Sequence, residues 1–463
     1  MDTRALFMRV SALAAMTVVV SCASQPASTS SASPSASPVS TPGAATKTSA
    51  PAPVAAPQSG PANPVSDFLK DFQGQTTPML QSGNYLGVVQ LLEKKAKEPG
   101  LDSNVKDMVR QLNGTYASFV GQYQDALEYF APGKAKPMDF DTVAFSRMTN
   151  ADAVDEITKF ATNRQAVFIN EAHHMPRHRA FTANLLPKLR ALGFSYLAVE
   201  TLDEADTALN RRGYPVHASG FYSNEPAFGE MLRIAMKLGF KLVPYEQASP
   251  TADGREEGEA KHIVERILKA DPKAKIVVHA GYDHINESGT LSGAKTMAIR
   301  FHEMTGIDPL TIDQVTMTEQ ADTTYEDVRY RFLMKHVRRQ TPFVLMNGDS
   351  VWSARPGMHD VTVISPRAVH RGGRPNWIWT MGGNVRRAYM ASDEACPGSL
   401  DCVITARRVA ESDDAVPVDI LRVQFSAPGS KTFALPPGQY VIEAKDGSGT
   451  PLSRRTITVA PPR

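Results

Sequence analysis

The sequence predicts an α/β fold, with a mostly parallel β-sheet flanked by helices, a helical segment before it and a small β-sandwich after it. In the middle of the chain, short apolar runs alternate with amphipathic helical stretches. Four consecutive runs of this kind end in glutamate or histidine. After about residue 386, short β-type runs are separated by turns rich in glycine and proline.

The first 21 residues have the pattern of a secretory signal. Arg4 and Arg9 precede an apolar run over residues 10–20, which is too short to span a membrane as a mature helix. The run ends in Val19-Val20-Ser21-Cys22, which resembles a lipobox, where the cysteine becomes an acylated N-terminus. We therefore expect cleavage before Cys22 and a lipid on that cysteine. The alternative is an ordinary signal peptide with a coincidental cysteine.

Residues 22–64 predict a disordered tether. After Cys22 they are almost entirely small, polar or proline residues, with Lys47 as the one charge. Such a segment buries too little apolar surface to offset its ordering entropy. About 40 residues of coil reach roughly 35 Å. We expect an exported body, in the periplasm or at the cell surface, anchored by lipid to the envelope. Ala23 does not indicate inner-membrane retention, so the outer membrane is favoured.

Composition excludes two classes of function. A net charge of +2 gives no electrostatic case for binding nucleic acid. After residue 22, no apolar run approaches the length that a membrane-spanning helix needs. The hydrophobic content of 42% and the charged content of 21% are typical of a globular protein.

Two cysteines remain for the folded part. Cys396 and Cys402 flank a Pro-Gly turn, and export would place them where disulfides persist. We expect them to pair, the alternative being two free thiols. Their spacing gives no zinc signature.

Residues 65–135 predict helices. Gly83-Asn84-Tyr85 and Gly121-Gln122-Tyr123 open two similar stretches. They resemble the tetratricopeptide repeat, whose unit is a helix pair. Two units are fewer than such an array needs alone. A helical cap packed on the next domain is therefore favoured over a repeat surface for a protein partner.

Residues 136–385 predict the α/β domain, and residues 386–463 predict the β-sandwich, as an accessory domain. Pro187 should kink or split the first helix of the α/β domain. The strands expected in the α/β domain lie at residues 166–170, 196–200, 241–246, 275–281 and 309–315, with further candidates at 343–346, 361–364 and 377–379. The helices lie at residues 179–192, 225–238 and 256–268. The strands of the sandwich lie at residues 403–407, 420–425, 432–435, 440–444 and 455–459.

Ionisable side chains follow the ends of four predicted strands. Parallel strands end on one edge of a sheet, where ligands bind in α/β proteins. Unpaired buried charge is costly, so this pattern predicts a polar active cleft. The residues at these strand ends are Glu171, His173 and His174 for the first strand, Glu200 for the second, Glu246 for the third and His284 for the fourth.

The histidines after the first strand are suited to chemistry. Pro176 fits the first position of a helix, which puts His173 and His174 in the preceding turn and His178 in the first helical turn. A helix N-terminus favours neutral imidazole, the form that a general base or a metal ligand needs. The alternative for His178 is a solvent-exposed helix residue, since its neighbours are arginines.

Several motifs together resemble the erythromycin esterase / ChaN-like / TraB-TIKI group, over roughly residues 150 to 320. Members open with Gly-Glu-x-His or Gly-Glu-x-x-His after their first strand. This chain has Asn170 where the group has glycine, which leaves the close backbone approach at that turn in doubt. The matching segments are Asn170-Glu171-Ala172-His173-His174 with His178, residues 192–200, Arg255-Glu256 just before a predicted helix, and Gly281-Tyr282-Asp283-His284-Ile285.

The resemblance implies two uses of the site. Esterase-like spacing maps onto Glu171 and His174, and those enzymes use a histidine-activated water without a required metal. ChaN- and TIKI-like spacing maps onto Glu171 and His173. ChaN-like lipoproteins bind haem and carry a second histidine after a proline, which matches Pro176 and His178. TIKI-like proteins are metal-dependent proteases.

We therefore predict an envelope-anchored hydrolase that acts on an ester or related bond of a small molecule. A haem- or metal-binding lipoprotein is the alternative, and a non-catalytic envelope scaffold is a second one, to which Asn170 points. The predicted catalytic residues are Glu171, His174 (or His173), Glu200, Arg255 and His284. The predicted cofactor-binding residues are His173, His178 and Glu246, with His173 and His178 as ligands of any divalent metal ion.

Overall fold

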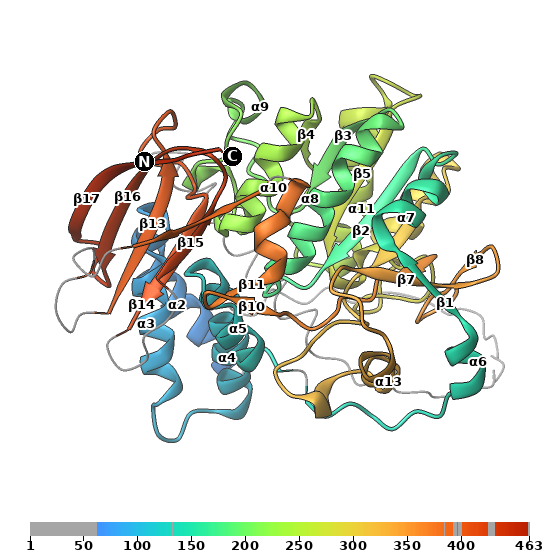
Figure 1. The fold of residues 1–463 in the computed structure, drawn as a ribbon, viewed down its shortest axis with the longest axis horizontal. Helices are drawn as coiled ribbons and strands as arrows, with labels where there is room; N and C mark the ends of the chain where they lie inside the picture. The colour runs from blue at the N-terminus through green and yellow to red at the C-terminus, as the bar shows by residue number, and fades with distance from the viewer. Residues whose placement is uncertain are drawn as a thin grey trace, which may run out of the picture.

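The computed structural model describes residues 63–131, 133–383, 385–391, 396, 401–424 and 431–461 (Figure 1). The predicted signal peptide, the lipid site at Cys22 and the tether up to residue 62 lie outside the described residues. Within the described ranges, no helix combines the length and the apolar character needed to cross a membrane.

A six-stranded parallel sheet forms the centre of the α/β region, which confirms the predicted fold class at this level. Its strand order is β4-β3-β5-β2-β6-β9, and every neighbouring pair is parallel. The strands are β2 (Ala166–Glu171), β3 (Phe194–Val199), β4 (Lys241–Pro244), β5 (Lys275–Gly281), β6 (Leu310–Asp313) and β9 (Val361–Thr362).

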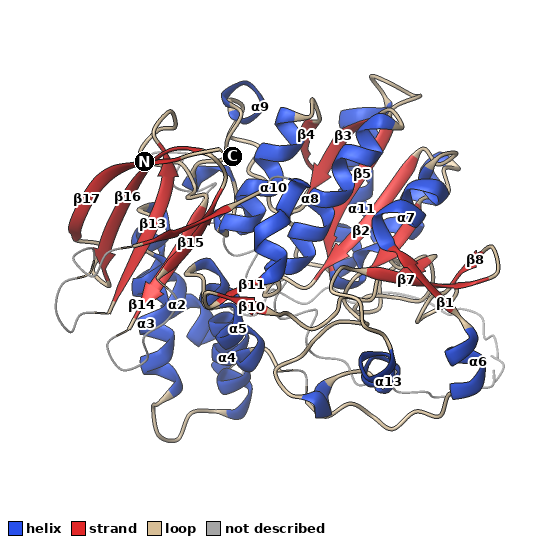
Figure 2. Ribbon diagram, in the orientation of Figure 1, coloured by secondary structure: helices blue, strands red, loops and turns tan. Residues whose placement is uncertain are grey.

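Helices cover both faces of this sheet (Figure 2). Along β2, Val167 and Ile169 pack with α7, α8 and α10, whereas Ala166 and Phe168 pack with α11 and α12. Successive side chains of a strand point to opposite faces, so a strand buried on both faces is apolar throughout. The helices are α7 (Ala153–Ala161), α8 (Pro176–Ala191), α10 (Pro226–Lys237), α11 (Ala252–Ile263) and α12 (Met297–Thr305).

The connections diverge between β2 and β5, which are neighbours at the centre of the sheet. From β2 the chain passes through α8 toward β3, on one side of this pair. From β5 it passes through η4 (Tyr282–Ile285) and α12 to β6, on the other side. Open α/β sheets bind ligands at such a switch point, in the crevice outside the carboxyl ends of the strands.

The N-terminal helices pack against the C-terminal strands (Figure 1). The Asn84 side chain donates a hydrogen bond to the Gly447 carbonyl at 3.0 Å, and Arg422 pairs with Glu93 at 2.7 Å. Asn63 caps the first of these helices, and Pro64 occupies its first turn. The helices are α2 (Pro64–Gln81), α3 (Tyr85–Ala96), α4 (Ser103–Phe119) and α5 (Tyr123–Tyr129).

The C-terminal region is antiparallel, as predicted. A four-stranded sheet has the order β14-β13-β16-β17, and β12 pairs with β15. A disulfide joins Cys396 to Cys402, with 6.3 Å between their Cα atoms. The strands are β12 (Arg387–Met390), β13 (Cys402–Arg408), β14 (Asp419–Val423), β15 (Thr432–Leu435), β16 (Gly438–Asp446) and β17 (Pro451–Val459).

Two strand predictions need correction. Residues 377–379 lie in a 3₁₀ segment, η6 (Asn376–Gly383), because a three-residue apolar run cannot distinguish strand from helix. Residues 343–346 do form a strand, but it belongs to a separate antiparallel sheet of order β1-β7-β8. These strands are β1 (Thr149–Asp152), β7 (Phe343–Asn347) and β8 (Ser350–Val351).

Two helix predictions also change. Helix α8 runs unbroken through Pro187, with Leu185, Leu186 and Leu189 buried around it, so tertiary packing outweighs the lost backbone hydrogen bond. Helix α11 begins at Ala252, capped by the Thr251 side chain, and a π-helical turn, η3 (Val264–Leu268), follows it. Arg255 therefore lies inside this helix and not before it.

Short elements complete the described chain. They are α6 (Thr142–Arg147), α9 (Leu209–Arg212), α13 (Val328–His336), η1 (His217–Ser219), η2 (Tyr222–Asn224), η5 (Thr323–Tyr325), β10 (His370–Arg371) and β11 (Arg374–Pro375).

Candidate functional site

Glu171, the last residue of β2, is held by a bidentate ion pair. It is 1% exposed, and Arg179 of α8 approaches its two oxygens at 2.7 and 2.8 Å. Burial raises the pKa of Glu171, but Arg179 and hydrogen bonds from His173 and His279 outweigh burial and hold that pKa well below its usual value. Glu171 is therefore a carboxylate at neutral pH.

Arg179 also fixes the neighbouring helix. Its Nη1 lies 2.9 Å from Glu225, whose carboxylate accepts the backbone N–H groups of Ala227 and Phe228 at the start of α10. His279 of β5 supports Glu171 from the other side, with 3.0 Å between its Nε2 and Oε2 of Glu171. We call Glu171, His173, Arg179, Glu225 and His279 the Glu171 group.

Sequence reasoning missed three members of this group: Arg179, Glu225 and His279. Arg179 was treated as a solvent-exposed neighbour of His178, yet it is fully buried. Its partner Glu225 lies 46 residues away, so no local pattern reveals the pair. The one available signal was His279, a histidine inside an otherwise apolar strand.

His173 is the histidine that Glu171 orients. Its Nδ1 lies 3.1 Å from the carboxylate, and its Nε2 is buried without a hydrogen-bond partner among the described residues. The ring stacks on Tyr222, with centroids 4.0 Å apart. It also lies against Gly281, where a Cβ atom would come within 2.3 Å of the ring. A carboxylate on Nδ1 places the proton there and leaves the Nε2 lone pair free.

His174 has different surroundings. Phe130 covers its ring face, with centroids 4.0 Å apart and planes 9° apart, and Nδ1 lies 3.4 Å from the Tyr282 hydroxyl. Burial, together with the nearby His178, holds the pKa of His174 well below its usual value. The carboxylate that orients a base thus contacts His173, and His174 packs against an aromatic wall.

The wall residue comes from the N-terminal helical segment. Phe130 follows α5 directly, and Arg110 of α4 donates to the carbonyls of Tyr129 and Ala131 at 3.0 and 2.7 Å. A Cβ atom on Gly114 would approach the Phe130 side chain at 3.0 Å, so this close packing depends on a glycine. The helical segment therefore contributes directly to the surroundings of the predicted site.

His178 is buried and supports the turn before α8, so its solvent-exposed alternative is wrong. The side chain is completely buried, and Nδ1 accepts the Ala172 backbone N–H at 3.0 Å. Burial, reinforced by Arg177, lowers the pKa of His178 to about 3. The neutral form was expected from the helix N-terminus, but burial is the larger cause.

Asn170 has a role that the glycine of the resembled motif could not fill. Its amide donates to the Tyr282 carbonyl at 3.0 Å and to Asp313 at 3.2 Å, and its oxygen accepts the Gln314 backbone N–H at 2.7 Å. One side chain thus links the ends of β2, β5 and β6. Tyr282 itself has a φ of 41°, a strained conformation for a non-glycine residue.

The second group of ionisable residues surrounds Arg255. The guanidinium lies 3.0 Å from Glu200, 2.9 Å from Glu259 and 3.9 Å from Glu246, and its Nη1 lies 3.1 Å from Nε2 of His284. We call Glu200, Glu246, Arg255, Glu256, Glu259 and His284 the Arg255 group.

Three members of the Arg255 group have raised pKa values, between about 7 and about 9. Burial lowers the pKa of His284, but Glu256, at 2.6 Å, and Glu259 outweigh it and raise that pKa to about 9. Burial raises the pKa of Glu259 to about 8 and that of Glu246 to about 7, and Arg255 offsets only part of this. Glu200 stays ionised because His173, His284 and Arg255 outweigh its burial and lower its pKa.

The two groups meet at Gly281. Its backbone N–H donates to Glu200, and the His173 ring lies against its Cα. All four predicted strand ends are therefore brought to one edge of the sheet, in the order β4, β3, β5 and β2. Glu171, His173, Glu200, Glu246, Arg255 and His284 lie in these two groups, His174 lies beside them, and His178 supports the turn.

A metal ion or haem finds little support in the described side chains. Glu256, Glu259 and His284 hold ligand atoms within 4.8 Å of one another, but the Arg255 guanidinium already supplies positive charge there. The predicted ligands His173 and His178 are not in that group. Haem needs an imidazole nitrogen that its iron can reach, yet His173, His174 and His178 are only 1%, 5% and 0% exposed.

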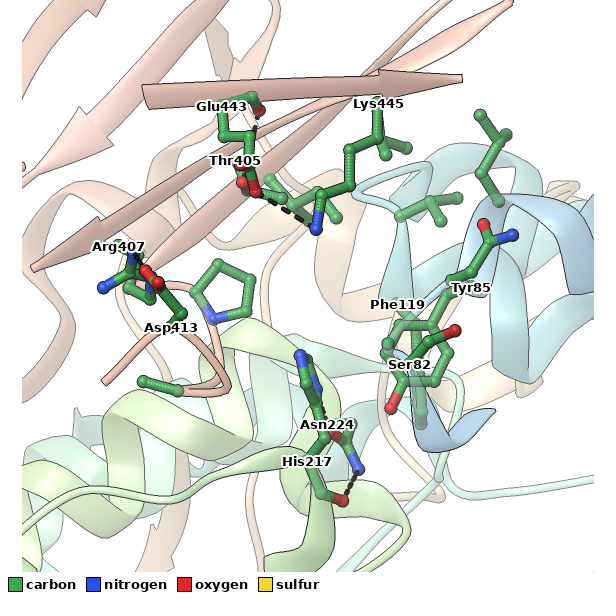
Figure 3. A pocket seen from close by; sticks show the side chains of 18 residues that line it. Ser82, Tyr85, Phe119, His217, Asn224, Thr405, Arg407, Asp413, Glu443 and Lys445 are labelled. Carbon is green, nitrogen blue, oxygen red and sulfur yellow. Dashed lines mark hydrogen bonds and ion pairs between the residues drawn. The ribbon is translucent and has the colours of Figure 1, made fainter. Parts of the chain in front are cut away.

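A separate crevice lies between the N-terminal helices and the C-terminal strands (Figure 3). His217 is hydrogen-bonded to Asn224 there at 2.9 Å, and Lys445 pairs with Glu443 at 3.1 Å. None of the predicted site residues lines it.

Comparisons with known proteins give only distant likenesses. No family model and no curated protein matches the chain. The type III effector HopBA1 is 15% identical with a TM-score of 0.26, over 38% of this chain and 92% of that one. A structure described as bacterial protein toxins is 13% identical with a TM-score of 0.29, over 54% and 64%. RRSP, a MARTX toxin effector domain from Vibrio vulnificus CMCP6, is 15% identical with a TM-score of 0.24, over 51% and 60%. Likeness at this level carries no functional argument.

Proposed function

We propose that this chain is an envelope-anchored lipoprotein whose α/β region hydrolyses an ester or related bond, with a histidine-activated water. The observation that carries the proposal is the contact between Glu171 and Nδ1 of His173, which leaves a buried Nε2 without a partner. A carboxylate–histidine pair of this kind activates water by general-base catalysis. The motifs that resemble the erythromycin esterase / ChaN-like / TraB-TIKI group also support hydrolysis as the function.

Each step of the proposed reaction uses a residue of the two groups. His173 Nε2 takes a proton from water, and the resulting hydroxide attacks the carbonyl carbon. Glu171 stabilises the imidazolium that forms, as a buried orienting carboxylate does. Arg255 stabilises the developing oxyanion, while Glu200 and Glu259 hold its guanidinium in place.

Comparison of the two adjacent histidines tests this proposal. In the purified protein, assayed on a panel of simple esters, His173→Ala should lose about 10²- to 10⁴-fold in kcat/KM. His174→Ala should lose much less, because no carboxylate orients His174. His336→Ala, an exposed residue of α13, serves as the control. A wild-type protein inactive on every ester, or equal losses in the two variants, would contradict the assignment.

The haem- or metal-binding alternative has its own measurement. Elemental analysis of the purified protein and an absorption spectrum with added haem separate it from hydrolysis. A Soret band that disappears in His178→Ala would favour binding over catalysis.

The lipid anchor is tested separately. Mass spectrometry of the membrane fraction should find a chain that begins at acylated Cys22, and Cys22→Ala should release the protein from that fraction. A chain cleaved elsewhere and soluble without the substitution would contradict the anchor.

A further inference from the structure

We propose that Glu246 is the general acid of this site, the carboxyl group that gives its proton to the leaving oxygen. The inference rests on the proposed hydrolase function and adds a catalytic role to a residue that the sequence analysis assigned only to cofactor binding. The four carboxylates of the Arg255 group differ in how far their side chains are exposed.

Glu246 is the most open of these carboxylates. Its side chain is 15% exposed, against 3% for Glu200, 2% for Glu256 and 1% for Glu259. Its Oε1 is buried without a hydrogen-bond partner among the described residues, and the Arg255 guanidinium is 3.9 Å away, beyond hydrogen-bond distance. A buried carboxyl oxygen without a donor is better accommodated protonated.

Its position beside Arg255 suits proton transfer to a leaving group. A carbonyl oxygen that becomes an oxyanion on Arg255 shares its carbon with the leaving oxygen, so the two oxygens are neighbours. Glu246 follows β4 at the edge of the sheet, whereas His173 follows β2, which is separated from β4 by β3 and β5. The proposal therefore places the acid and the base on opposite sides of the reacting carbon.

The backbone beside Glu246 carries strain. Thr201, directly after Glu200, has a φ of 62°, which is an outlier for a β-branched residue. Its N–H interacts with the Glu246 carboxylate. Strain of this kind clusters at functional sites, where the surrounding structure maintains it.

Electrostatics support the same role. Burial raises the pKa of Glu246 to about 7, with Glu200 of β3 raising it further, while Arg255 of α11 and His284 of η4 lower it. A group with a pKa near the working pH is both protonated often enough and acidic enough to transfer a proton.

The reaction balances with water as the only co-reactant. The water oxygen bonds to the carbonyl carbon, and His173 takes the water proton. The bond from carbon to the leaving oxygen breaks, and that oxygen takes the Glu246 proton and departs as an alcohol. The imidazolium proton returns to the Glu246 carboxylate through solvent, which restores both groups.

Matched esters that differ only in the leaving group test the proposal. We would assay 4-nitrophenyl and ethyl esters of acetate, butyrate and benzoate, because 4-nitrophenolate departs without a proton and ethoxide does not. Glu246→Gln should lose about 10²- to 10⁴-fold in kcat on the ethyl esters and much less on the nitrophenyl esters. The wild-type decline of kcat/KM on ethyl esters above about pH 7 should disappear in this variant.

Two variants keep the test interpretable. Glu246→Asp retains a carboxyl group and should recover part of the ethyl-ester activity, whereas Glu257→Gln, an exposed change on α11, should leave both rates unchanged. Equal losses on both ester types would overturn the acid role, as would an unaffected Glu246→Gln beside an inactive His173→Ala. A wild-type protein inactive on every ester would overturn the proposed function, and the acid role with it.

Discussion

The Arg255 group at the sheet edge and a second buried cluster beside α10 differ in how their charges balance. Around Arg255, four carboxylates face one guanidinium and one imidazole. In the second cluster, two carboxylates face three guanidiniums, and Arg233 lies 2.6 Å from Glu411. We call this second cluster, made of Glu230, Arg233, Arg386, Arg408 and Glu411, the α10 cluster.

The difference agrees with a structural role for the α10 cluster and with the catalytic role that we propose for the Arg255 group. Burial raises the pKa of Glu230, but Arg408, Arg233 and Arg386 outweigh it, so its pKa is lowered and its charge is permanent. Burial instead raises the pKa values of Glu246 and Glu259 to about 7 and about 8, and one guanidinium shared among four carboxylates offsets only part of this. Opposed shifts of this kind identify acid and base groups at active sites.

The largest expected effect is a loss of catalysis without a loss of folding, in His284→Ala. His284→Ala should reduce kcat about 10²- to 10³-fold or more, because the positive charge of the imidazolium beside Arg255, which helps to stabilise the oxyanion, is then lost. Circular dichroism should show that the fold is intact. Full activity of His284→Ala on an ester that the wild-type protein hydrolyses would remove the Arg255 group from the mechanism.

Breaking the α10 cluster should lower stability and leave kcat unchanged, which is the reverse of the effect expected for His284→Ala. Glu230→Ala leaves Arg386 with an uncompensated buried charge, which costs about 3–5 kcal/mol of unfolding free energy. Urea denaturation measures this loss, and kcat per folded molecule should not change. A fall in kcat without a fall in stability would make the two clusters alike.

The two clusters should also respond to pH in opposite directions. Glu246, Glu259 and His284 have pKa values in the folded state of about 7, 8 and 9, above the ordinary 4.5 for glutamate and 6.5 for histidine. Through these three groups the folded state binds more protons, and their contribution to stability falls as pH rises from about 4.5 to about 9. The lowered pKa of Glu230 instead removes stability as pH falls.

Denaturation midpoints across this pH range check the prediction. Glu246→Gln should flatten the part of the curve between pH 4.5 and about 7, and Glu230→Gln should leave that part unchanged. A wild-type protein whose stability rises steadily between about pH 4.5 and about pH 9 would contradict the direction of pH dependence that we assign to the Arg255 group.

The smallest effect is expected within the α10 cluster itself. The Arg408 side chain is 32% exposed and lies 3.4 Å from Glu230, so Arg408→Ala should cost only about 0.2–1 kcal/mol. Arg386→Ala, at a side chain only 2% exposed, should cost more. Equal losses, measured by thermal denaturation, would show that burial does not set the strength of these pairs.

The sequence predicted the sheet edge well because strand ends are a local feature. Glu171, Glu200, Glu246 and His284 each follow a recognisable apolar run, and parallel strands bring such positions together. The choice between His173 and His174 was not predictable, since both occupy one turn and only the orientation of each ring decides which meets Glu171.

Features that depend on distant partners were missed. A charged helix residue such as Arg179 is usually exposed, and only the fold brings it onto Glu171 and Glu225. Asn170 looked like a defect of the motif because its hydrogen-bond partners lie on other strands. Pro187 was expected to kink or split α8, and the helix is not split because helix propensity is a weak guide where tertiary packing dominates.

The contacts of the N-terminal helices with the C-terminal strands affect the order of folding. Asn84 and its partner Gly447 are 363 residues apart, a separation that ribosomes cover in roughly 20–70 s. The helices are made first, yet the surface that they pack against is made last. Contacts of such long range also form slowly. The part of the helical surface that contacts the C-terminal strands therefore stays uncovered until synthesis is nearly complete.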